Sequence, residues 1–253
     1  MEAWLQVVKL VFSDIKGEIE RRLLVNYRVD PAVVARVLPD PFRPLLVGEA
    51  AVAGICLIRL GRMRPRYAPV FGLRSENAAH RFAVEWDTDS GTRTGVYIPR
   101  RDSSSRINVL LGGRIYPGSH HLARFRVSET ADDVRVAFTS NDRSASVDVA
   151  VRVAEDLEGS RLFADLGHAS AFFEAGAVGY SPSRKGTFEG MGLKTEAWRV
   201  QPASVIHAHS SFFDDRTVFP TGSAELDCAL LMRKVPVTWE TLGTLKGTVD
   251  VMA

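Results

Sequence analysis

Hydrophobic and polar residues alternate along much of the chain, which is the pattern of β-strands with one buried face. The clearest example is residues 147–153, in which valines alternate with alanine or charged residues. Bounded by turn-forming residues, further runs of this kind predict strands at 23–29, 45–60, 80–86, 94–99, 123–127, 134–138, 197–201, 203–212 and 224–233. The chain is therefore expected to consist mainly of strands.

Three stretches show helical spacing instead. Apolar residues near helical spacing predict an amphipathic N-terminal helix over about 3–20. A short helix is predicted after Asp30, which can cap its start, with Pro31 at the first helical position. A third helix is predicted over 160–175.

No repeat, low-complexity tract or flexible linker divides the sequence, so residues 1–253 are interpreted as a single domain. A turn signal at 87–93 predicts a hairpin between two strands. The regular helices that a doubly wound α/β fold needs between its strands are missing. The pattern therefore predicts a mainly β (α+β) fold: an antiparallel barrel or a large curved sheet with a few helices.

Composition narrows the function classes. The net charge of +2 gives no overall field that would gather nucleic acid or an anionic membrane, so neither is expected as a partner. No apolar run is long enough to span a bilayer, and Glu2 stands where a secretory signal carries basic residues. Cys56 and Cys228 lie in apolar runs without a spacing motif and are expected to be buried, reduced thiols. These features predict a cytoplasmic protein.

Candidate chemistry centres on His120 and His121 at the start of a predicted strand. Adjacent residues of a strand point to opposite faces, so we expect one of these side chains in a pocket and the other outside it. His207 and His209 share a face and form half of a metal site, but no third ligand follows a metal-binding spacing, so no metal is predicted.

Polar residues also crowd the entrance of the strand at 80–86, and we predict Glu76 and Arg81 on the rim of a pocket. Arg100 and Arg101 fall where a hairpin loop is expected and are interpreted as solvated. Nucleotide-binding glycine loops and a nucleophile elbow are missing from the sequence, so no cofactor is predicted.

Two stretches together resemble the acetoacetate decarboxylase-like superfamily, namely NYRVDPAVVARVLPDPF (26–42) and GGRIYPGSHHL (112–122). Within the superfamily, the chain looks closest to the YqjF-like proteins, a family of unknown function, over about residues 20–235. The resemblance implies a cone-like or double β-barrel with an interior pocket. It also places Arg114 and Tyr116 next to that pocket, and Arg21 or Arg22 near the position of the family's carboxylate-binding arginine.

The chain departs from the decarboxylases at the catalytic lysines. The resemblance aligns His120 and His121 with two adjacent lysines, the first of which forms an imine with the keto substrate. Imidazole cannot form such an imine, so imine-type decarboxylation is not expected. The resemblance favours His120 as the inward residue, whereas strict alternation with the apolar Ala123 and Phe125 favours His121. We expect His120, because a pocket carries a few polar groups.

The sequence thus predicts a small-molecule-binding protein with a pocket for an organic acid or keto metabolite. Two alternatives stay open. One is a lyase or hydrolase that uses His120 or His121 as an acid or base. The other is a structural or interaction protein with a vestigial pocket. Assembly into a homo-oligomer is also left open.

Overall fold

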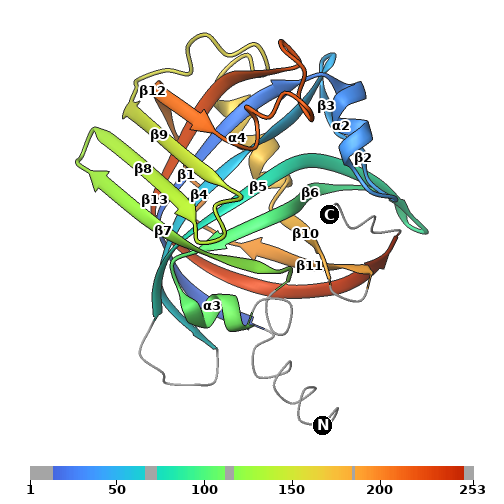
Figure 1. Ribbon diagram of the computed structural model, residues 1–253, viewed down its shortest axis with the longest axis horizontal. Coiled ribbons are helices and arrows are strands. Elements are labelled where there is room, and N and C mark those ends of the chain that lie inside the picture. The colour runs from blue at the N-terminus through green and yellow to red at the C-terminus, as the bar shows by residue number, and fades with distance from the viewer. Residues whose placement is uncertain (1–13, 66–72, 112–116, 184–185, 248–253) are drawn as a thin grey trace.

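The computed structural model describes residues 14–65, 73–111, 117–183 and 186–247. Most of them lie in one strongly curved sheet of 13 strands (Figure 1). Helices are short and few among these residues. The prediction of a mainly β, cone-like fold is therefore confirmed.

Two closed circuits of strand pairing organise the sheet. We call the first the seven-strand ring; it consists of β1 (Asp14–Val29), β4 (Ala50–Pro65), β5 (Leu73–Thr88), β6 (Gly91–Ser103), β10 (Val178–Pro182), β11 (Thr187–Lys194) and β13 (Ala224–Lys246). The second, the nine-strand ring, shares β6, β5, β4, β1 and β13 and closes through β7 (His120–Glu129), β8 (Asp133–Ser140), β9 (Ser146–Val153) and β12 (Gln201–Ser210). The five shared strands form a common wall between two interiors.

Two short strands complete the sheet. β2 (Arg43–Pro44) pairs with β5, and β3 (Leu46–Val47) pairs with β4. All described pairings are antiparallel except those of β6 with β7 and of β6 with β10.

Long strands with irregular positions allow the wall to serve both rings. β13 pairs with β12 near Leu230 and with β11 from Thr238 onward, while β1 pairs with it from Ala224 to Glu240. Arg62 has a φ angle of 53° and lies where the register between β4 and β1 shifts, and β13 shifts its register against β1 opposite Asn26 and Tyr27. Such bulges bend and twist a strand, which lets it pass from one ring to the other.

Alternating side chains of the common wall fill two different interiors. Leu23 and Val25 of β1 are fully buried in the core of the nine-strand ring, together with valines of β8 and β9. Leu24 points the other way and packs against a separate apolar cluster that includes Phe173. Burial of alternate apolar residues on both sides explains why these strands are rich in hydrophobic residues.

The helices occupy the ends of the rings. The short helix α2 (Pro31–Val37) begins as predicted, with the Asp30 carboxylate accepting a hydrogen bond from the amide of Ala32 at 2.7 Å. α4 (Leu166–Ala175) packs on the apolar cluster around Leu24. α3 (Arg106–Leu111) was not expected and lies beside the start of β7.

The third predicted helix begins later than expected. The Asp227 carboxylate accepts hydrogen bonds from the Ser160 hydroxyl at 2.6 Å and from the backbone amides of Arg161 and Leu162. These contacts hold 160–162 in a non-helical conformation, and the helix starts only at Leu166.

The predicted N-terminal helix is wrong over residues 14–20, which belong to β1; residues 1–13 lie outside the described part. Ile15 and Ile19 are four residues apart, as on a helix face, but both are buried by pairing of β1 with two neighbouring strands. Tertiary pairing overrides a local pattern of this kind. No helix in the described ranges is long and apolar enough to cross a membrane.

The two-residue strand β2 and the longer strands β10 and β11 were missed. β10 and β11 lie in a stretch where glycines interrupt the apolar alternation. A Cβ atom at Gly190 would lie 2.5 Å from the Tyr180 ring of the neighbouring strand, so glycine allows this close pairing. The predicted strand at 197–201 is absent except for Gln201, where β12 begins.

Candidate functional site

A cavity of about 360 Å³ lies inside the seven-strand ring. Every strand of that ring contributes to its lining, with Arg22, Cys56, Ala79, Ile98, Val178, Met191 and Trp239 as one example each. Helix α3 and the first residue of β7 complete the wall. The volume falls within the range of small-molecule sites.

Arg81 is the most deeply buried of the arginines in the cavity wall, with 3% of its surface exposed. Its Nη2 donates to the Asn26 side-chain oxygen, and its guanidinium lies 4.8 Å from the centre of the Phe173 ring. The Nε atom has no hydrogen-bond partner among the described residues. Burial lowers the pKa of Arg81 to about 10, which still leaves it a cation at neutral pH.

Two further arginines face the same cavity. Arg22 Nε donates to the Cys56 sulfur at 3.3 Å, and its guanidinium stands 5.8 Å from the Trp198 ring centre. Its Nη1 is buried and lacks a partner in the described part. Arg101 Nε donates to the Ser181 hydroxyl at 3.0 Å, and burial lowers the pKa of Arg101 to about 10. The cavity therefore has three guanidinium groups in its wall.

Among the described lining residues, no carboxylate is free to balance these charges. Asp102 is the one acidic residue among the described lining residues, and its two oxygens accept from Arg100 Nε and Nη2 at 2.9 Å each. Its side chain is fully buried, and this burial raises its pKa. The cavity is consequently electropositive and suited to an anion.

His120 lines the cavity, whereas His121 does not. His120 Nδ1 lies 3.2 Å from the Gly118 carbonyl oxygen, which only accepts, so Nδ1 carries the proton and Nε2 is an acceptor. Burial, reinforced by Arg101, lowers the pKa of His120 to about 3. His121 is 40% exposed and its Nδ1 lies 3.0 Å from an oxygen of Asp142.

The expected divergence of the two histidines is thus confirmed, with His120 as the inward residue. The apolar face of β7, which includes Ala123 and Phe125, packs in the nine-strand ring. The opposite face of β7 points out of that ring. At the start of β7, where His120 pairs with Arg101, this outer face borders the seven-strand ring.

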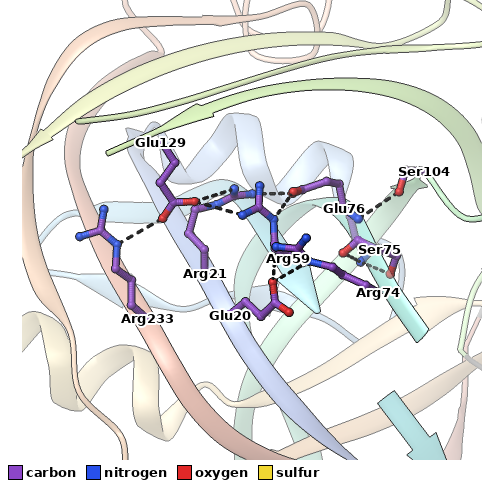
Figure 2. A network of polar contacts seen from close by, with 10 residues as sticks. Glu20, Arg21, Arg59, Arg74, Ser75, Glu76, Ser104, Glu129 and Arg233 are labelled. Carbon is purple, nitrogen blue, oxygen red and sulfur yellow. Dashed lines mark hydrogen bonds and ion pairs between the residues drawn. The ribbon is translucent and has the colours of Figure 1, made fainter. Parts of the chain in front are cut away.

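Glu76 and Arg21 do not line the cavity, in contrast to the expectation from the sequence. They belong to a network of ion pairs, shown in Figure 2, in which Glu76 binds Arg21 at 2.6 Å and also Arg59. Glu129 lies 3.5 Å from Arg21, 3.3 Å from Arg59 and 3.3 Å from Arg233. Strand alternation separates these residues from the cavity.

Their chain neighbours take the expected places instead. Asn77 lines the cavity in place of Glu76, and Arg22, the second of the two arginines named from the sequence, lines it in place of Arg21; Arg81 lines it as expected. Asn108 of α3 donates to the Ser75 hydroxyl at 3.2 Å and to the Asn77 side-chain oxygen at 3.3 Å, which fixes the helix to the ring. Arg114 and Tyr116 lie outside the described residues.

Sequence reasoning missed Arg101 and Cys56 as cavity residues. Arg101 was assigned to a solvated loop, but β6 continues through it to Ser103. Cys56 and Cys228 are buried free thiols, as predicted. His207 and His209, which were considered as half of a metal site, are exposed, and His209 Nδ1 lies 2.7 Å from an oxygen of Asp214. No three potential metal ligands cluster within the described ranges.

Comparison with known proteins gives a family and a fold. A family model, DUF2071, described as "Uncharacterized conserved protein (COG2071)", matches residues 16–235. No curated protein matches the sequence.

Several solved structures are similar. An acetoacetate decarboxylase-like enzyme from Sphingomonas wittichii RW1 is 10% identical, with a TM-score of 0.57 over 93% of this chain and 91% of that one. Acetoacetate decarboxylase from Legionella pneumophila is 12% identical, with a TM-score of 0.57 over 94% and 88%. The enduracididine biosynthesis enzyme MppR, complexed with the condensation product of pyruvate and imidazole 4-carboxaldehyde, is 14% identical, with a TM-score of 0.59 over 91% and 87%. The TM-scores over most of both chains show a common fold, and together with the family match they confirm the resemblance expected from the sequence.

Proposed function

The chain belongs to the DUF2071 family, and from this premise we propose that it binds the carboxylate of a small organic acid or keto metabolite in the cavity of the seven-strand ring. Bound pyruvate-derived ligand in the similar MppR fold supports a small keto acid as one ligand class. The three arginines of the wall are the observation that carries the proposal.

Buried cations are costly unless an anion compensates them. Arg22 and Arg81 each keep a buried N–H without a partner in the described part, and Asp102 is already bound by Arg100. A ligand carboxylate can accept from these N–H groups, and guanidinium–carboxylate pairs are among the stronger hydrogen bonds in proteins. An anionic ligand therefore fits the wall better than a neutral one.

Imine chemistry has little support in this cavity. The described lining residues include no lysine, and His120 stands at the position that the resemblance assigns to the imine-forming lysine. These residues favour ligand binding without a covalent imine.

A lyase or hydrolase is the second candidate, because His120 offers an unprotonated Nε2 at the cavity wall. A pKa of about 3 makes His120 a weak base in the free protein. A bound carboxylate nearby would increase that basicity. If His120 is the catalytic base, the rate of keto-acid turnover should fall at acidic pH as one group becomes protonated. His120→Gln should abolish turnover. These two results would favour this candidate over binding alone.

We expect pyruvate, acetoacetate and butyrate to bind more tightly than their neutral amides, as measured by isothermal titration calorimetry. Arg81→Gln should weaken acid binding by about tenfold or more, because charge-assisted hydrogen bonds contribute roughly 1.5–3 kcal/mol. Arg124→Gln, on the exposed face of β7, is the matched control and should bind as the wild type does. Equal affinities for acids and amides would contradict the proposal and favour a vestigial pocket.

Borohydride added with acetoacetate should not attach the ligand covalently. Reduction traps an imine between a lysine and a ketone, and the described cavity wall offers no lysine for that step. Intact-mass spectrometry should show the unmodified chain, with a lysine-dependent decarboxylase as the positive control. A mass increase that peptide mapping assigns to a lysine would refute the expectation.

A further inference from the structure

Charged lining residues gather at one level of the cavity, and the lining toward helix α3 is uncharged. Strand register places Cys56 opposite Ala79 and Ala79 opposite Arg101, so this level of the wall carries the charged groups. Four positions further along β4, Leu60 pairs with Ser75, and the polar residues at this level, Ser75, Asn77 and Asn108, are hydrogen-bonded to one another. The wall thus carries no charge toward the end of β4, where Leu60 and Met63 line it.

On the far side of the ring, the lining away from the arginines is also uncharged. Leu193 of β11 pairs with Trp239 of β13, and Trp239 pairs with Ile15 of β1. All three line the cavity. Ile15 lies seven positions from Arg22 on the same strand, which corresponds to about 23 Å of strand length. The lining is therefore long as well as graded.

Helix α3 marks the apolar end. Ile107 and Leu111 line the cavity there, and the hydrogen bonds of Asn108 to Ser75 and Asn77 hold the helix in place. Ile107 is 47% exposed, so this end borders solvent. The charged end is closed off by the side chain of Phe173 from α4, on which Arg81 stacks.

We propose that the ligand is an amphipathic carboxylic acid, with its carboxylate at Arg22, Arg81 and Arg101 and a long apolar body directed toward α3. Its chemical class is that of a medium-chain fatty acid or an arylalkanoic acid, with or without an oxo group. The inference rests on the proposed function and extends it, because pyruvate or butyrate would leave the apolar end of the cavity unfilled.

The test is a titration of the full chain with butyrate, hexanoate and octanoate. The dissociation constant should fall about fourfold for each added methylene, the factor expected for a CH₂ group leaving water. Octanamide should bind at least tenfold more weakly than octanoate, because it lacks the charge that the arginines recognise.

Variants separate the two ends of the ligand. Leu60→Gln and Leu193→Gln should weaken octanoate binding by about tenfold and leave butyrate binding unchanged. Arg81→Gln should weaken both acids. Ile206→Gln replaces an apolar residue that is 61% exposed on β12 and does not line the cavity, so it controls for surface effects.

The outcomes separate the two proposals. Equal affinities for butyrate and octanoate, with amides excluded, would overturn the amphipathic ligand and keep the acid-binding function. Tighter binding of long acids that Leu60→Gln and Leu193→Gln do not affect would also overturn it. If no acid binds better than its amide at any chain length, both proposals fail.

Discussion

Cys56 is expected to react with iodoacetate at least about tenfold faster than with iodoacetamide, relative to a free thiol in solution. The two reagents are similar in size and differ in charge. Arg22 donates to the Cys56 sulfur at 3.3 Å, and the same cavity wall carries Arg81 and Arg101. Attraction equivalent to 1.4 kcal/mol between a bound anion and these cations gives a tenfold preference. Intact-mass kinetics and peptide mapping measure the two rates.

Cys228 is an internal control in the same chain. It is also buried, but it does not line the cavity, and burial raises its pKa to about 12. Native protein should therefore become carboxymethylated once, at Cys56. Arg22→Gln should remove most of the preference for iodoacetate. Similar rates at the two cysteines, or the same rate with both reagents at Cys56, would argue against an anion-attracting cavity.

Acid is expected to destabilise the fold through His80. This side chain is fully buried on the nine-strand side of the wall, 4.8 Å from the Phe212 ring centre, and neither ring nitrogen has a partner in the described part. Burial, reinforced by Arg100, lowers the pKa of His80 to about 3 from 6.5. Below pH 6.5 the unfolded chain therefore binds a proton that the folded chain does not.

The unfolding free energy should consequently fall as the pH drops from about 6.5 toward 3, by up to about 1.4 kcal/mol per pH unit for this group. His80→Leu should remove that contribution, so urea unfolding curves of wild type and variant should diverge by about 3 kcal/mol between pH 6.5 and 4. His120, with a pKa of about 3, acts in the same direction in both proteins.

His207→Leu is the matched control, since His207 is exposed on β12. It should follow the wild-type pH dependence. Titration of carboxylates lowers stability in all three proteins and cancels in the difference. Parallel curves for wild type and His80→Leu across this range would show that His80 is not the source of the pH dependence.

Alternation within single strands was readable from the sequence, and it correctly separated His120 from His121. The same rule also separates Arg21 from Arg22 and Glu76 from Asn77, but the sequence does not say which interior each face borders. That assignment depends on the closure of the seven-strand ring through β10 and β11, and the glycines at 190 and 192 obscured β11 in the sequence. Glu76 was therefore expected in the cavity, whereas it binds Arg21 on the other side.

The full length of the strands was also not predictable from local sequence patterns. β1 begins at least nine residues before the strand predicted at 23–29, and β6 extends past the proline and arginines that suggested a loop. In both cases the extension is paired on two sides, by β4 and β13 or by β5 and β7. Pairing partners distant in sequence stabilise such ends, so propensity alone underestimates them.

The common wall also constrains how genes of this family can change. Shifting a strand by one residue turns every side chain to the opposite face. Deleting one codon early in β1 would move Arg22 to the position of Arg21 and Leu23 to the position of Arg22, so the cavity would lose a guanidinium. Point substitutions can alter one lining and spare the other. Insertions and deletions within the five shared strands must alter both at once, so we expect length variation among relatives to gather in the connecting loops.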